Sequence, residues 1–217
     1  MDVEKLIELH PRLYHMAESG TWLSIKQRGL MSASAVLDHF GVRGRARDAY
    51  ETSQRREKMI VLPGQPGQIV LRDQKPMPPE RLEAALIDGT TPAQWYKLIN
   101  EKVFFWAEEK RLLGLLGARA YRHLEHDVLT IDSAPFIRTY AEQIWLCRMN
   151  SGNTWPMPHA RGIDVFQRIP NYPANSRGKP AKRVVELVVD RCVPDIARYV
   201  VEVRRMRGPE LLGHRKL

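Results

Sequence analysis

The apolar segments of this 217-residue sequence are short, and strand-like and helix-like segments follow one another without a regular period. Apolar residues at alternate positions predict strands, and apolar residues three or four apart predict helices. Strands are expected at residues 13–16, 59–62, 68–72, 102–106, 127–131, 183–190 and 198–203. Helices are expected at residues 2–9, 22–29, 32–40, 44–58, 80–87, 92–99 and 108–121. Because this order lacks βαβ spacing, it favours one α+β domain over residues 1–217.

Several protein classes are disfavoured by simple sequence features. No run of 18 apolar residues occurs, so no membrane span is predicted. The first residues lack the basic start and apolar core of a signal peptide. Cys147 and Cys192 fit no metal or redox spacing, and His123 and His126 fit no zinc signature and are predicted to lie in a hydrophilic loop. We therefore expect a cytoplasmic protein with reduced thiols and no bound metal.

The chain carries a net charge of +9, from 34 Lys and Arg against 25 Asp and Glu. Residues 177–217 hold 11 basic and 5 acidic side chains, and residues 43–58 hold 6 and 3. A positive field of this kind attracts polyanions, including nucleic acids and nucleotide phosphates. The alternative is a solvated basic surface without a specific partner.

Glu186 interrupts an apolar strand, Val184-Val185-Glu186-Leu187-Val188-Val189. Alternation puts Glu186 on one face with Val184 and Val188. A carboxylate in such surroundings costs free energy unless it is paired or faces a cleft. Glu186 is therefore a candidate functional residue, and the alternative is an exposed glutamate on an edge strand.

Residues 13–32 combine a short strand that contains His15 with a helix that follows at once and ends at Gly29. This layout can bring a polar ring and a helix start to one place, which suits a nucleotide phosphate. A second segment, Val103-Phe104-Phe105-Trp106, offers aromatic rings for packing or for stacking on a ligand. Arg72, at the end of a strand, is a candidate phosphate ligand, although a solvated arginine is as simple an explanation.

These segments, in this order, resemble the histidine-type ADP-ribosyltransferases, and among them the DarT toxins that modify DNA bases. Tyr14-His15, then Ser24-Ile25 and Gly29-Leu30, is similar to the DarT opening, which reads Tyr-His-Ile-Thr and later Ser-Ile and Gly-Leu. Residues 103–106 resemble the aromatic second strand of that superfamily. Residues 185–189, with Val193-Pro194 after them, resemble the segment that holds the catalytic glutamate. Met16-Ala17 departs from the motif, and residues 150–180 have no counterpart in DarT. The Leu-Tyr-His start, Val-Phe-Phe-Trp and Asn-Ser-Gly also resemble an uncharacterised bacterial family related to these toxins.

The resemblance implies a split, mixed β-sheet with NAD as substrate in its cleft. It implies that His15 binds the adenosine-side ribose and that Glu186 binds the nicotinamide ribose. The catalytic arginine of the family has three candidates, Arg55, Arg56 and Arg72, and Arg56 is assigned beside Glu186. The cofactor-binding residues implied by matching position are His15, Met16, Ala17, Ser24, Ser32, Arg72, Phe105 and Trp106.

On this resemblance we expect an NAD-dependent ADP-ribosyltransferase that modifies nucleic acid, with a DNA base favoured by the positive charge and a protein acceptor as the alternative. Relationship to toxins also implies an antitoxin partner. Two other functions remain open at this point. An RNA 2′-phosphotransferase also uses NAD, but it does not depend on a glutamate such as Glu186. A non-catalytic nucleic-acid-binding domain would bind in a salt-sensitive manner without any response to NAD.

Overall fold

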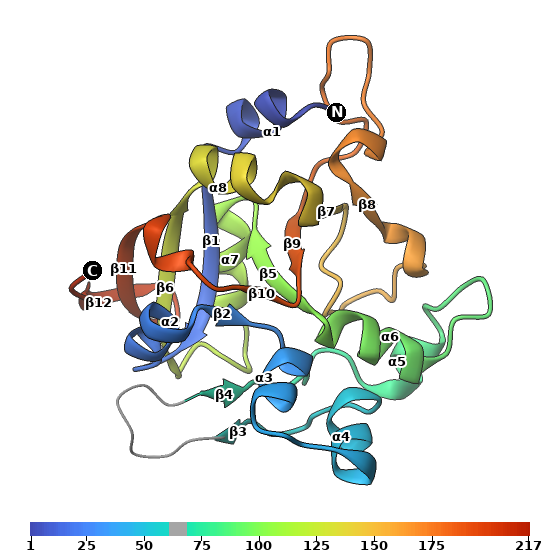
Figure 1. The fold of residues 1–217 in the computed structure, drawn as a ribbon. Coiled ribbons are helices and arrows are strands. Elements are labelled where there is room, and N and C mark those ends of the chain that lie inside the picture. The colour runs from blue at the N-terminus through green and yellow to red at the C-terminus, as the bar shows by residue number, and fades with distance from the viewer. Residues whose placement is uncertain (61–68) are drawn as a thin grey trace.

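The structure is a computed structural model that describes residues 1–60 and 69–217 (Figure 1). Its main element is an eight-stranded sheet with the order β12-β11-β6-β1-β5-β9-β7-β8. Every pairing in this sheet is antiparallel. The strands are β1 (Arg12–Glu18), β5 (Lys102–Trp106), β6 (Glu125–Asp132), β7 (Ile144–Cys147), β8 (Phe166–Arg168), β9 (Glu186–Asp190), β11 (Val200–Arg207) and β12 (Glu210–His214). Two short pairs lie apart from it, β2 (Leu30–Met31) with β10 (Cys192–Val193), and β3 (Met59–Ile60) with β4 (Val70–Leu71).

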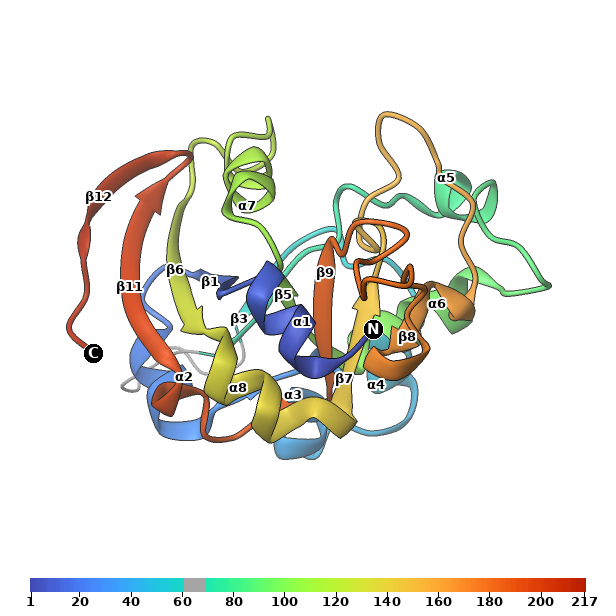
Figure 2. The same ribbon diagram turned by 90° about the horizontal axis from the view of Figure 1, so that it is seen from above.

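Helices cover both faces of the large sheet, and Figure 2 shows α7 and α8 on opposite sides of it. Local sequence explains several helix starts: Ser32 caps α3, and Thr91 and Gln94 form a capping box on α6. The helices are α1 (Val3–Leu9), α2 (Trp22–Arg28), α3 (Ala33–His39), α4 (Gly44–Glu51), α5 (Pro79–Glu83), α6 (Pro92–Asn100), α7 (Glu109–Leu116) and α8 (Ser133–Tyr140). Short 3-10 turns are η1 (Ala141–Gln143), η2 (Ile163–Val165), η3 (Ile169–Asn171) and η4 (Ile196–Arg198).

The two faces of the sheet have separate cores, as strand alternation requires. On one face Phe105 and Leu187 pack with residues of α1, α2 and α8. On the other face Val188 packs under α6, and Val128 packs under α7. Glu186 pairs with Trp106 and shares its face with Val188, so it lies on the α6 and α7 side of the sheet.

The pairing between β1 and β5 is the weak seam of the sheet. Strand β1 pairs with β6 along its whole length, but it pairs with β5 only at Tyr14 and Trp106. Beyond that pair the strands are linked by the ring of His15, which bonds to the Phe104 carbonyl. An opening between two central strands is therefore built into the sheet.

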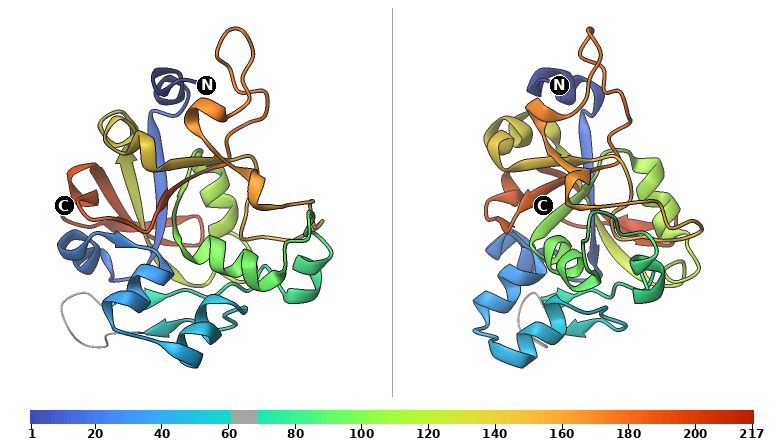
Figure 3. Two further views of the ribbon diagram at one scale, coloured as in Figure 1. Left: turned by 45° about the vertical axis from the view of Figure 1, so that its right-hand side comes forward. Right: turned by 90° about the vertical axis from the view of Figure 1, so that its right-hand side faces the viewer.

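Helices α3 and α4 and the β3–β4 pair form a smaller unit next to the seam, opposite α1 and the 173–182 loop (Figure 3). Val36, Leu37, Ile69 and Leu71 make its apolar core. Gly29 joins this side to the sheet: its φ is +81°, and a Cβ there would lie 2.5 Å from the Pro194 Cα. Only glycine accepts both the left-handed backbone and this close approach.

Most expected elements are present, and several expectations are wrong. The sheet is antiparallel among the described residues rather than mixed. Helix α4 ends at Glu51 and α7 at Leu116, earlier than expected. Helix α8 is capped by Asp132. The strands β2, β7, β8, β10 and β12 were not anticipated. Part of the expected hairpin, residues 61–68, lies outside the described residues.

The α+β class is confirmed. Within residues 1–60 and 69–217, no helix combines the length and the apolar character that a membrane crossing requires.

Candidate functional site

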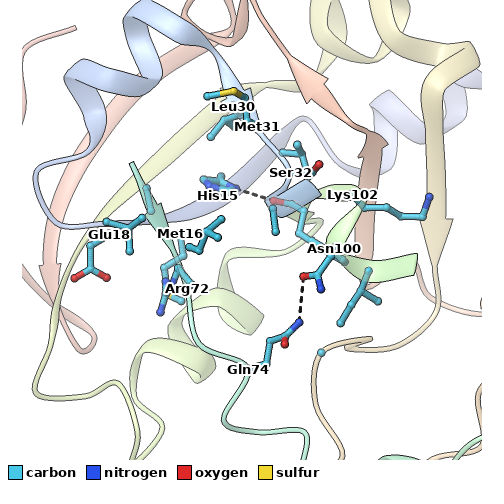
Figure 4. A pocket seen from close by; sticks show the side chains of 18 of the residues that line it. His15, Met16, Glu18, Leu30, Met31, Ser32, Arg72, Gln74, Asn100 and Lys102 are labelled. Atoms are coloured by element: carbon cyan, nitrogen blue, oxygen red, sulfur yellow. Dashed lines mark hydrogen bonds between the residues drawn. The ribbon is translucent and has the colours of Figure 1, made fainter. Parts of the chain in front are cut away.

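A pocket of about 350 Å³ opens where β1 and β5 separate. Its volume falls in the range of small-molecule sites. Figure 4 shows His15, Met16 and Arg72 around one space, with Ser32 on one side and the hydrogen-bonded pair Gln74 and Asn100 on another. The segments that line the pocket come from β1, α2, β2, α3, β4, β5, the 150–153 turn and the start of β9. Segments that are far apart in the sequence thus meet at the seam.

Glu186 is a buried acid of this pocket, at the first position of β9. Its side chain is 4% exposed. The backbone N–H of Ser151 donates to both carboxylate oxygens, at 3.3 and 3.2 Å. Burial raises the pKa of Glu186 to about 7, although hydrogen bonding from Ser151 and the charges of Arg161 and Arg111 act in the opposite direction. The carboxyl therefore changes charge near neutral pH, where a bound cation favours the ionised form.

His15 lines the same pocket from β1. Its Nδ1 lies 2.8 Å from the Phe104 carbonyl oxygen, and because a carbonyl only accepts, Nδ1 carries the proton. Burial lowers the pKa of His15 to about 4, and the nearby charge of Arg72 acts in the same direction. The ring is thus neutral at pH 7, and its Nε2 is an acceptor suited to a hydroxyl group.

Arg72, just after β4, brings a positive charge to the pocket. Its guanidinium lies 5.3 Å from the centre of the Tyr121 ring, and Nη2 is 3.3 Å from Nε2 of His126. Its Nη1 is buried and has no hydrogen-bond partner within the described ranges. Buried donors normally have a partner, so an anionic group in the pocket would satisfy this one. His126 is fully buried in β6 rather than in a loop, which corrects the sequence expectation.

The three candidate arginines have different positions. Arg56 is exposed and does not line the pocket, so its assignment beside Glu186 is wrong. Arg55 lines the pocket but is used internally: it donates to the carbonyls of Arg72 and Tyr50 and to Asn100 Oδ1, at 2.8–2.9 Å. Of these three arginines, Arg72 is the one at the pocket whose Nη1 has no hydrogen-bond partner among the described residues.

The aromatic residues also need a correction. Phe105 is fully buried on the opposite face from Glu186, where its ring lies 5.0 Å from that of Phe136. Phe105 lines the pocket beside His15, with ring centres 5.8 Å apart, but its ring is buried in the core of that face. Trp106 is half-buried, pairs with Glu186 across the strands and lines the pocket. Its position follows from alternation, because successive side chains point to opposite faces.

The remaining predicted residues also line the pocket. Met16 is half-buried, and Ala17 is buried in β1. The Ser24 hydroxyl accepts from Arg28, and the Ser32 hydroxyl accepts from the N–H of Ala35 as the cap of α3. Both serines are thus engaged within the protein.

Sequence reasoning missed part of the wall. Asn100, Lys102 and the 150–153 turn line the pocket and were not assigned to a site. Nothing in the local sequence shows that Ser151 faces Glu186, because this contact depends on the packing of β7 beside β9.

Among the residues that the structure describes, no group of three His, Cys, Asp or Glu side chains is placed to hold a metal ion.

The fold defines an α+β protein with a pocket at the seam of an antiparallel sheet. Residues 11–200 match a family described as a family of unknown function, DUF7002. The chain belongs to this family. A comparison with curated proteins gives no match.

Proposed function

We propose that this protein is an NAD-dependent ADP-ribosyltransferase whose active site is the pocket at the β1–β5 seam. One observation carries the proposal: three motifs far apart in the sequence, which contain His15, Trp106 and Glu186, line one pocket. The single pair that joins β1 to β5 supports a split sheet of the ADP-ribosyltransferase type. The antiparallel pairing differs from the mixed sheet that we expected.

The chemistry of Glu186 suits the loss of nicotinamide. Positive charge develops on the ribose as the bond to nicotinamide breaks, and a fixed carboxylate stabilises it. In the free protein burial raises the pKa of this carboxyl to about 7. The cationic nicotinamide ring of NAD would lower the pKa again by charge attraction. Substrate binding would thus supply the ionised form that catalysis needs.

The other two groups suit the rest of the NAD molecule. His15 offers a neutral ring with an acceptor nitrogen, which can receive a hydrogen bond from a ribose hydroxyl. Arg72 offers a buried N–H group that has no partner in residues 1–60 and 69–217, which suits a pyrophosphate oxygen. Trp106, beside Glu186, offers an aromatic surface for the nicotinamide ring. No metal is required for any of these roles.

The acceptor that we propose is nucleic acid, with a DNA base favoured. The net charge of +9 supports attraction to a polyanion. The two cysteines are free, which fits action in the reducing cytoplasm. Relationship to toxins would add an antitoxin as protein partner.

The test is transfer of label from ³²P-NAD to single-stranded DNA, duplex DNA, RNA and lysate protein. We expect label in a nucleic acid with wild type and none with Glu186→Gln. Glu142→Gln, which removes an exposed carboxylate, should behave as wild type. Absence of transfer to every acceptor together with absence of NAD hydrolysis would refute the proposal. Release of a cyclic ADP-ribose phosphate from 2′-phosphorylated RNA would replace it with the phosphotransferase reaction.

A further inference from the structure

Arg161 is a buried cation that has no carboxylate partner at hydrogen-bond distance among the described residues. It is 1% exposed, and its guanidinium lies 5.7 Å from the centre of the Trp95 ring. All three guanidinium nitrogens donate to backbone carbonyls. Nη1 reaches Ser151 at 3.0 Å, Nη2 reaches Asn153 at 2.9 Å, and Nε reaches His159 at 3.1 Å.

Such an arrangement is costly, because burial of a cation removes its hydration. Carbonyl oxygens return part of this cost through charge-assisted hydrogen bonds. The planar fork of arginine reaches two carbonyls that are two residues apart, and the single ammonium of lysine has no equivalent geometry. The arrangement thus fixes the backbone of the 150–153 turn.

The backbone of Arg161 is itself anchored. Its N–H donates to the Ala85 carbonyl at 2.8 Å, and its carbonyl accepts from Ile87 at 3.1 Å, in the segment that follows α5. The end of the turn is held separately, since the N–H of Thr154 donates to the Pro76 carbonyl at 3.0 Å. Arg161 therefore holds the 150–153 turn in a fixed position relative to the segment that follows α5.

The 150–153 turn also contacts Glu186, a buried acid of the pocket. The N–H of Ser151 donates to both oxygens of Glu186, and the Ser151 hydroxyl is fully buried without a partner among the described residues. The other groups that bear on this carboxyl are Arg161, Arg111 on α7 and the buried thiol of Cys147 on β7. A shift of the turn would therefore move the Ser151 N–H group, the backbone donor that orients Glu186.

We propose that Arg161 is a positioning residue that holds the 150–153 turn and thereby sets the orientation of the Glu186 carboxylate. Its catalytic consequence rests on the function proposed above. Its structural consequence, the contact between Ser151 and Glu186, does not.

The first test reads that contact without any substrate. In wild type the Ser151 amide should follow the ionisation of Glu186 in ¹H–¹⁵N spectra, with a midpoint that reflects the pKa of about 7, and Glu186→Gln should abolish the titration. In Arg161→Met the amide should lose this titration. Arg161→Lys, which keeps the charge, should lose it as well, and it is the variant to read if Arg161→Met does not fold.

The control is Arg168→Met. Arg168 is another arginine near β9, but it is half-buried, stacks on Trp145 and pairs with Asp190. This variant should keep the Ser151 titration. A wild-type titration of Ser151 in folded Arg161→Met or Arg161→Lys would overturn the proposal.

The second test measures NAD consumption. We expect kcat to fall about 10²-fold in both Arg161 variants, as for a displaced catalytic group, with KM for NAD nearly unchanged. Rescue of kcat by Arg161→Lys would show that charge alone matters and would overturn the positioning role. If wild type consumes no NAD, the proposed function fails, and the Ser151 titration still decides the role of Arg161.

Discussion

Replacement of Glu186 by glutamine should stabilise the protein relative to wild type, and this difference should grow as the pH rises. Glu186 is 4% exposed, and burial raises its pKa from 4.5 to about 7 in the folded state. The folded protein therefore holds this proton more tightly than the unfolded chain does, so wild type loses stability as the pH rises from about 4.5 to about 7. Each pKa unit corresponds to about 1.4 kcal/mol, which gives a total loss of about 3 kcal/mol.

Glutamine keeps the shape of the side chain but has no proton to lose, so Glu186→Gln escapes this loss. The assay is urea unfolding of both proteins at pH 5, 6, 7 and 8, with the difference in unfolding free energy plotted against pH. We expect the advantage of the variant to grow by about 2.5 kcal/mol between pH 5 and pH 8, because part of the loss is already complete at pH 5. Glu142→Gln, at an exposed site, should show little change across this range. A difference for Glu186→Gln that is constant or shrinks with pH would refute the buried, neutral carboxyl.

Three further predictions concern the seam. Gly29→Ala should lower the free energy of unfolding, measured by chemical denaturation, by about 2 kcal/mol or more. The reason is that a Cβ at this positive φ would meet the backbone of Val193 and Pro194. A variant as stable as wild type would contradict this packing. Phe105→Ala should lower the free energy of unfolding by about 3–5 kcal/mol, because it truncates a core side chain. Trp106→Ala should mainly weaken NAD binding in calorimetry. The reverse pattern would contradict the assignment of these two side chains to opposite faces. His15→Phe should raise the Kd for NAD about tenfold, the equivalent of one hydrogen bond, and an unchanged Kd would exclude His15 as an acceptor.

Local pattern was enough to predict five of the eight strands of the central sheet, β1, β5, β6, β9 and β11. The aromatic strand was expected at residues 102–106, and β5 spans Lys102–Trp106. Alternation also placed Glu186 and Val188 on one face, as the register with Trp106 and Phe104 confirms. These features are predictable because side-chain direction in a strand has a period of two residues.

Contacts between distant segments were not predictable in this way. Arg55 and Arg56 are neighbours in the sequence, and only the packing of α4 near α6 turns the first toward Asn100 and leaves the second exposed. Arg161 lies in an irregular, proline-rich region, and its partners are backbone carbonyls that no side-chain pattern reveals. Strand pairing direction is likewise a property of the whole sheet, so the mixed sheet could not be rejected from sequence.

Irregular composition also hid two strands. Residues 150–180 hold several prolines and turn residues, which masked the short β8 strand within them. Strand β7 has four residues and directly follows the α8–η1 segment, so its pattern is too brief to separate from a helix. Yet β7 and its following turn provide the Ser151 contact to Glu186. The least regular part of the sequence therefore completes the pocket.

The most direct measurement is release of nicotinamide from NAD, followed by proton NMR with wild type, Glu186→Gln and the exposed-site control Glu142→Gln. The proposed function predicts release by wild type and by Glu142→Gln, and a fall of about 10²-fold or more with Glu186→Gln, as expected on removal of a transition-state stabilising group. Equal rates for wild type and Glu186→Gln, or no release by wild type with any acceptor present, would contradict it.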